Sequence, residues 1–280
     1  DMAAAVFLLF KTKLYRIKLK FHWDTTKEML RFSLPMIPNQ LSWWVSKSSA
    51  KYILSFVGGV AANGVFSIAH KIPSIFNVIA GIFSSAWRIS AVDGLHEKDT
   101  KGFYSTIYNN YCSVLTLGTS FCILFNRPIA ALLYSKDFYQ AHIFVPTLLI
   151  AVMFNSLGDH LGSIYITQKK TKPIFITTLI SAVINITLGL VLIPTIGGMG
   201  ASLATLAGYF CIWFIRLIHS RTLIKLDFRY FLDATTFVLL AVQAGLEYLA
   251  LPYCWVFSAV IFCTILILRR DIIALVLTTA

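Results

Sequence analysis

Charged residues are scarce in this sequence. They make up 13% of its 280 residues, whereas apolar residues make up 58% and the mean hydropathy is +0.75. Soluble globular domains carry about 25% charged residues, so the composition excludes that class. Apolar stretches of about 20 residues, long enough to cross the hydrocarbon core as a helix, recur along the chain. The sequence therefore predicts an all-α, polytopic membrane protein.

Motifs for bond-making catalysis are also missing. The sequence has no phosphate-binding P-loop, no G-x-S-x-G, no H-E-x-x-H and no acidic pair suited to glycosyl transfer. Its five cysteines fall within predicted spans and lack C-x-x-C or other metal-ligand spacing. They are Cys112, Cys122, Cys211, Cys254 and Cys263. We therefore expect no enzyme, no metal site, and buried free thiols.

About eight transmembrane helices follow from the hydropathy pattern, each bounded by charged residues, glycine or proline. The predicted spans are Phe32–Val57, Ala62–Ile89, Phe103–Phe125, Ile143–Thr167, Ile174–Ile193, Met199–Ile215, Leu232–Leu249 and Tyr253–Leu268. Residues 1–10 do not have the pattern of a signal peptide. We interpret them as the end of a truncated transmembrane helix, an N-terminal stub.

The distribution of positive charge predicts the orientation. Lysine and arginine number 24 against 12 acidic residues, a net charge of +12. Most of these basic residues fall in loops on one side of the membrane, and only Arg127 and Lys136 fall in loops on the other. The positive-inside rule places the first side, together with the C-terminus, in the cytoplasm. The excess of positive charge is thus explained by the orientation of the protein in the membrane, and we expect no nucleic-acid partner.

Lysines inside the spans are the sharpest functional signal, because each costs about 2.5–3.5 kcal/mol at mid-helix. Gln40, Trp44, Lys47 and Lys51 are spaced four, three and four residues apart, which predicts one stripe on one helix. Helical rise puts Lys71 of the next span level with Lys47, and neither span contains an acidic residue. Two interpretations remain: a hydrated cationic cavity, or pairing with an acid outside this sequence. Lys51 either joins that cavity or extends to the interface.

Asp159 and His160 lie closer to the cytoplasmic end of their span. An adjacent intramembrane Asp and His suit ion coupling, by relaying a proton or coordinating Na⁺. The alternative is that Asp159 pairs with a neighbouring hydroxyl or with Arg88. Because Asp159 lies below the level of Lys47, we expect no salt bridge between them. Glu247, near an outer end, is expected at the interface. No cofactor is expected beyond a coupled H⁺ or Na⁺.

Three stretches carry a family resemblance: residues 30–54 (LRFSLPMIPNQLSWWVSKSSAKYIL), 58–87 (GGVAANGVFSIAHKIPSIFNVIAGIFSSAW) and 168–205 (QKKTKPIFITTLISAVINITLGLVLIPTIGGMGASLAT). They resemble the polysaccharide transporters, the O-antigen and teichoic-acid type flippases of the multidrug/oligosaccharidyl-lipid/polysaccharide (MATE-like) exporter superfamily. Such proteins have two six-helix lobes facing a central cationic cavity, often followed by two extra helices.

The resemblance implies a division into four parts. Residues 1–10 would end a truncated helix, 11–31 would be a basic cytoplasmic loop, 32–221 the six-helix C-terminal lobe, and 222–280 two extra helices with a short cytoplasmic tail. The implied localisation is the bacterial cytoplasmic (inner) membrane. The implied partners are membrane lipids, a lipid-linked oligosaccharide and the missing N-terminal lobe.

The implied activity is flipping of undecaprenyl-pyrophosphate-linked oligosaccharide repeat units for polysaccharide, O-antigen and lipopolysaccharide biosynthesis. Lys47, Lys51 and Lys71 would then attract the pyrophosphate, while Trp44 and Gln40 would contact sugar. The chain departs from its relatives at Ala50, where Ser49-Ala50-Lys51-Tyr52 replaces the usual Ser-Asp-Arg-Tyr. The acid of any internal ion pair is lost, whereas a cation for phosphate survives. The alternatives are a MATE-type drug or metabolite antiporter, or an inactive truncated product.

Overall fold

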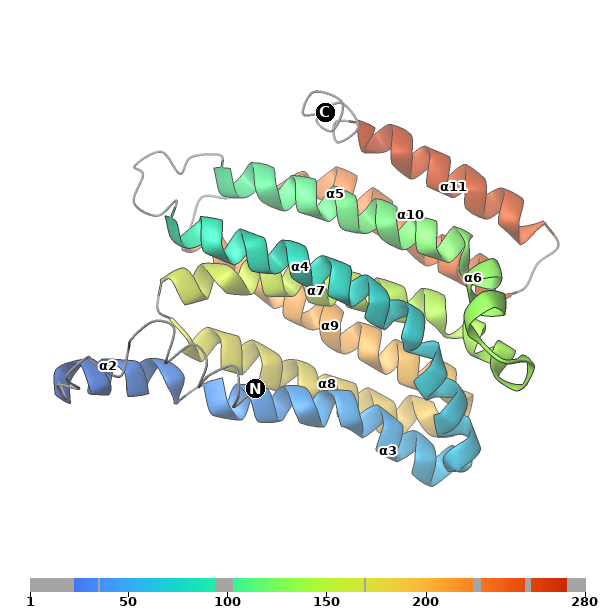
Figure 1. The fold of residues 1–280 in the computed structure, drawn as a ribbon, viewed down its shortest axis with the longest axis horizontal. Coiled ribbons are helices and arrows are strands. Elements are labelled where there is room, and N and C mark those ends of the chain that lie inside the picture. Colours follow the sequence, from blue (N-terminus) through green and yellow to red (C-terminus); the bar gives the residue numbers. More distant parts are fainter. Residues whose placement is uncertain are drawn as a thin grey trace, which may run out of the picture.

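The computed structural model describes residues 23–34, 36–93, 103–168, 170–223, 228–249 and 253–270, so the predicted stub at 1–10 lies outside it. These ranges are helical and contain no strand (Figure 1). The elements are α2 (Trp23–Ser33), α3 (Met36–Ala69), α4 (Lys71–Asp93), α5 (Phe103–Leu124), α6 (Asn126–Leu133), the 3-10 helix η3 (Lys136–Ile143), α7 (Val145–Thr167), α8 (Lys172–Ile196), α9 (Gly198–Ser220), α10 (Tyr230–Tyr248) and α11 (Cys254–Leu268). The all-α class is confirmed.

Within the described ranges, four helical stretches are long and apolar enough to cross a membrane, and the pair α5 and α6, bent by 67°, makes a fifth if counted as one span. The first of these, Trp23–Ser85, contains the predicted span Phe32–Val57 and most of Ala62–Ile89. The helix α11 has only 15 residues, which rise about 22 Å. The eight predicted spans therefore all correspond to helices, but not all of those helices meet the length and hydropathy criteria by themselves.

The start of the described chain differs from the expectation. Residues 23–31, predicted as part of a cytoplasmic loop, lie in the helix α2. Its exposed side chains include Trp23, Met29 and Leu30 as well as Lys27 and Arg31. A loop between spans can itself be helical, and hydropathy does not reveal this when the helix is short and charged.

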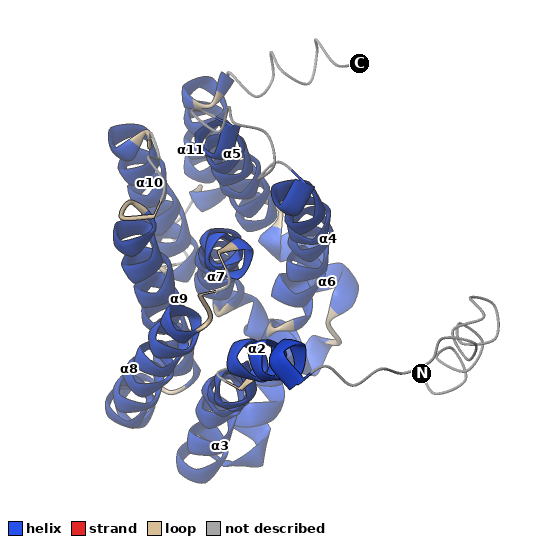
Figure 2. Cartoon of the chain, turned by 90° about the vertical axis from the view of Figure 1, so that its left-hand side faces the viewer, coloured by secondary structure: helices blue, strands red, loops and turns tan. Residues whose placement is uncertain are grey.

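The helix α3 has a kink at Gly59, which falls between the predicted spans Phe32–Val57 and Ala62–Ile89. Gly59 has φ 81° and ψ 172°, which is not helical, so α3 consists of two helical segments that meet at this kink, and the chain turns again at His70. Pro73 falls in the first turn of α4, where a missing amide hydrogen is tolerated. The two helices then diverge, with α3 packed on α8 and α9, and α4 packed on α7 (Figure 2).

Replacing Gly59 with alanine is expected to destabilise the fold by about 1–2 kcal/mol, because a side chain is strained at this φ. An added Cβ would meet nothing within 4 Å, so a loss of stability would come from backbone strain and not from a steric clash. Thermal unfolding in detergent measures it. Gly245→Ala is the matched control, since that glycine is helical and also open, and it should be neutral or stabilising. Equal effects at both positions would contradict the strained kink.

The helix α7 lies in the middle of the bundle and is buried along most of its length (Figure 2). It packs against α4, α5, α9 and α10, while α10 and α11 pack on α5 and on each other. Residues 32–221 thus include α3 to α9, and the two last helices lie against the α5 side. The divergence of α3 from α4 leaves a space floored by α7 and α9, where the candidate site lies.

Candidate functional site

A cavity of about 240 Å³ lies between α3 and α4 near the kink. We call it the lysine cavity. It is lined by Ser46, Lys47, Ala50, Lys51, Phe66 and His70 of α3 and the turn after it, Pro73, Ser74 and Asn77 of α4, Leu148, Ala151, Val152 and Asn155 of α7, and Thr205 and Tyr209 of α9. These described lining residues include two lysines and no aspartate or glutamate. Nothing on its wall neutralises the positive charge.

A second cavity, of about 380 Å³, continues toward the start of α3. We call it the amide cavity. Its lining is Met36, Asn39, Gln40, Trp43, Lys47, Asn77, Gly81, Ser84, Asn155, Ser156, Asp159, Gly162, Ile166, Ile174 and Arg216. Lys47, Asn77 and Asn155 line both cavities, so the two adjoin. The second wall is dominated by neutral amide and hydroxyl groups.

The structure brings together three of the five residues assigned to substrate. Lys47 lines both cavities, Lys51 lines the lysine cavity and Gln40 the amide cavity. Lys71 is exposed and is not among the residues that line either one. The chain turns twice between Lys47 and Lys71, at the non-helical Gly59 and again at His70, directly before Lys71.

The aromatic side chain of the site is Trp43 rather than Trp44. Trp44 is 59% exposed and is absent from both linings, whereas Trp43 lines the amide cavity. Neighbouring residues on a helix differ by about 100° in direction, so one of two consecutive tryptophans must point away. Gln40, Trp43 and Lys47 follow an i, i+3, i+7 pattern that predicts one face equally well.

Trp43 holds Lys47 in place. The Lys47 Nζ atom lies 5.6 Å from the centroid of the Trp43 ring, and that ring packs against Tyr209 with centroids 5.7 Å apart. A cation over an aromatic face gains about 0.5–1 kcal/mol at exposed sites. The ammonium group at the junction of the two cavities is therefore supported by a ring of its own helix.

Asp159 has a partner that sequence reasoning did not assign. Its Oδ1 lies 3.5 Å from Nη1 of Arg216, which we expected in a cytoplasmic loop but which is 1% exposed. The same guanidinium donates from Nη1 to the Gly158 carbonyl at 2.9 Å, from Nε to Thr177 at 3.1 Å and from Nη2 to Thr178 at 3.3 Å. The Asp159 side chain is 47% exposed toward the amide cavity.

His160 does not face these cavities. It is buried and lies beside the rings of Tyr108 and Tyr111, with centroids 6.0 and 5.3 Å away. Asp159 and His160 thus belong to different environments although they are adjacent in sequence. The side chain of Arg88, the other expected partner of Asp159, lies outside the described residues.

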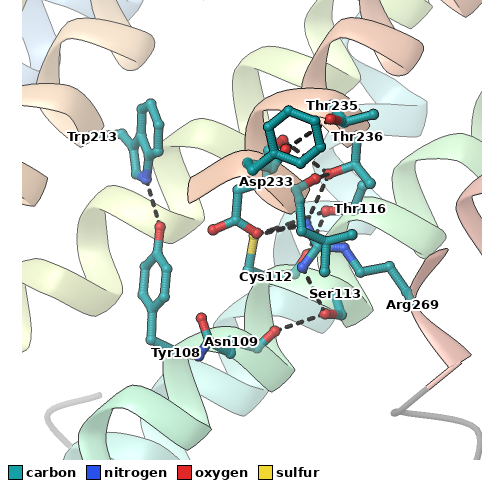
Figure 3. A network of polar contacts seen from close by, with 12 residues as sticks. Tyr108, Asn109, Cys112, Ser113, Thr116, Trp213, Asp233, Thr235, Thr236 and Arg269 are labelled. Carbon is teal, nitrogen blue, oxygen red and sulfur yellow. Dashed lines mark hydrogen bonds and ion pairs between the residues drawn. The ribbon is translucent and has the colours of Figure 1, made fainter. Parts of the chain in front are cut away.

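A buried polar network joins α5, α10 and α11 (Figure 3). Arg269 Nη2 lies 2.6 Å from Asp233 Oδ1 and donates to Thr236 at 2.8 Å, while Nη1 donates to Ser113 at 3.0 Å. Cys112 donates its thiol to the same Asp233 oxygen at 3.5 Å. The sequence did not predict this ion pair, because Arg269 directly follows the last predicted span. Basic residues in that position are usually cytoplasmic residues that set the orientation in the membrane.

Glu247 is part of a second network at the other end of α10. It lies in the last turn of α10 and is 8% exposed, and its Oε1 lies 2.8 Å from Nε of Arg127. Asn126 and Cys254 also donate to it, at 3.5 and 3.8 Å. The thiols are free, but Cys263 is exposed on the bundle surface, contrary to the expectation of burial for all five.

The described residues form an all-helical bundle with a polar cavity between diverging helices. No family model and no curated protein matches the chain. Among solved structures, it is similar to the lipid II flippase MurJ in an inward closed conformation, with a TM-score of 0.58 and 16% sequence identity. The expected all-α, polytopic fold is therefore confirmed.

The similarity covers 98% of this chain and 60% of the MurJ chain. The chain therefore spans about three fifths of the length of the flippase that it matches. At this level of identity the likeness concerns the fold, and the chemistry of the site is argued from its residues.

Proposed function

We propose that the chain is the second lobe, with two extra helices, of a transporter that flips lipid-linked oligosaccharides across a membrane. The observation that carries the proposal is the lysine cavity, whose described wall holds Lys47 and Lys51 and no carboxylate. A cationic cavity without an internal counter-ion suits an anionic ligand, because isolated charges at membrane depth are unfavourable. The pyrophosphate of a lipid carrier supplies the missing negative charge.

The identity of the lipid carrier, the mode of transport, the location and the ion-coupling group belong to the same proposal. Undecaprenyl pyrophosphate would carry a repeat unit of a polysaccharide or O-antigen, and a first lobe would face the cavity from the opposite side. Transport would proceed by rocking of the two lobes. The bacterial inner membrane with a cytoplasmic C-terminus remains the proposed location. Asp159 is the proposed ion-coupling group, since His160 lines neither cavity.

An antiporter of organic cations is the competing function, and the residues that line the two cavities argue against it. A cationic drug requires an acid, and the acid lining the described cavities is Asp159, which already contacts Arg216. The lysine cavity would repel such a ligand. The wall chemistry also contains no nucleophile–base pair of the kind that group transfer requires, which favours a transporter over an enzyme.

The proposal is tested by comparing an anionic with a cationic ligand. The purified chain in detergent is expected to bind farnesyl pyrophosphate, with quenching of tryptophan fluorescence because Trp43 lies beside Lys47. Binding should weaken about tenfold or more when salt is raised from 50 to 500 mM, since screening acts on partly exposed charges. Trp43→Phe should reduce the signal and identifies its origin. Preferential binding of tetraphenylphosphonium, an organic cation, would contradict the proposal.

A further inference from the structure

The amide cavity differs from the lysine cavity in the ligand that its wall can hold. Four neutral amide side chains line it, namely Asn39, Gln40, Asn77 and Asn155, together with the hydroxyls of Ser84 and Ser156. Each amide offers a carbonyl acceptor and two N–H donors. Such a wall matches a ligand that carries many groups able both to donate and to accept, while its charged residues, Lys47, Asp159 and Arg216, sum to a charge of only +1.

Two of these amides have an unmet hydrogen-bonding requirement. The Oδ1 atoms of Asn39 and Asn155 accept no hydrogen bond from the residues that the structure describes, and Asn39 is only 4% exposed. A buried carbonyl without a partner is unfavourable, and native proteins rarely retain one without a reason. Neither oxygen is exposed to the cavity in this conformation, so a ligand hydroxyl or amide donor would satisfy them once the amides turn toward it.

Asp159 makes a second anion unfavourable here. Its carboxylate is half-exposed in the amide cavity, and Arg216 holds it by contact with Oδ1. Four of the five N–H groups of Arg216 are directed to Thr177, Thr178, Gly158 and Asp159, which fixes the guanidinium. A phosphate would meet a like charge, whereas a hydroxyl would find an acceptor.

Trp43 adds an apolar surface to this polar wall. Its ring is half-buried against Tyr209 and lines the amide cavity beside the Lys47 ammonium. A sugar ring has an apolar face of C–H groups as well as hydroxyls at its edge, so an aromatic ring next to amides can contact both. Lys47 joins this surface to the lysine cavity.

We infer that the amide cavity is a carbohydrate subsite, which receives the first sugars of a lipid-linked substrate while the lysine cavity receives its pyrophosphate. The inference rests on the proposed function. It fixes the orientation of the ligand on this lobe: the pyrophosphate lies toward the Gly59 kink, and the sugars lie toward the start of α3. Gln40 and Asn39 are specificity residues of the subsite, and Arg216 positions Asp159.

The test compares two ligands on the full 280-residue chain, in a detergent without a sugar headgroup. One is farnesyl pyrophosphate, and the other is farnesyl pyrophosphate bearing a disaccharide of N-acetylhexosamines. The disaccharide is expected to raise the affinity by about tenfold or more, because two or three new hydrogen bonds form. Gln40→Leu and Asn39→Leu should each remove most of that increase, while Lys47→Gln should weaken both ligands.

Gln140→Leu is the matched control, because Gln140 is an exposed glutamine of η3 and lines neither cavity. It should leave both affinities unchanged. Equal affinities of the two ligands for the unmodified chain would overturn the carbohydrate subsite and leave the proposed function standing. Equal losses for both ligands in Gln40→Leu would also overturn it. Failure of both ligands to bind the unmodified chain would overturn the proposed function and this inference with it.

Discussion

Replacing Arg269 with glutamine destabilises the described bundle by about 3–5 kcal/mol, the effect expected when one partner of a buried ion pair is removed. Asp233 is 5% exposed, and the substitution would leave its carboxylate facing Cys112 without its cation. The hydrogen bonds to Thr236 and Ser113 would be lost as well. Thermal unfolding in detergent should show the loss, accompanied by faster proteolysis after α9, because α10 and α11 are released from α5.

Arg270→Gln supplies the matched control. Arg270 is the next residue in the chain and is exposed, so its removal should change stability by less than about 0.5 kcal/mol. The double variant Asp233→Leu with Arg269→Leu should recover much of the loss, since apolar residues can replace a buried pair at little net cost. Equal stability of Arg269→Gln and Arg270→Gln would show that the network does not hold the last helices.

The helices were predictable because burial in lipid imposes a simple requirement on the sequence. A spanning segment must satisfy its own backbone hydrogen bonds and present apolar side chains over its length. Hydropathy therefore located the long apolar helices, but it missed the short elements α2, α6 and η3. It carries no information on lateral neighbours, because lipid and protein contacts are equally apolar. The sequence gives no sign that α3 packs on α8 rather than on α4.

The site was predictable in part, for a related reason. The spacing of Gln40, Lys47 and Lys51 defines a helix face, and that face lines the cavities. The position of Lys71 depended on the turns between the two spans, and the chain turns at His70 as well as at the non-helical Gly59. Asp159 and Arg216 meet across α7 and α9, a tertiary contact that no local pattern encodes.

Replacing Lys47 with alanine in the native host is expected to abolish surface-glycan export at unchanged abundance in the membrane. Lys47 lines both cavities and would contact the pyrophosphate at its junction with the sugars. A hydrogen bond to a charged group contributes about 1.5–3 kcal/mol, which corresponds to roughly a 10- to 100-fold loss of affinity. Lys47→Arg should retain most export, because it preserves the charge and the contact with Trp43.

Lys71→Ala is the discriminating comparison, because the two lysines were predicted to act together. Lys71 is exposed beyond the break at His70 and lines neither cavity, so its replacement should leave export largely intact. If export is lost in both variants, the site extends past the described cavities along α4. If export survives in Lys47→Ala, the ammonium group plays no part in transport, and the cationic wall must be explained by a counter-ion from elsewhere in the transporter.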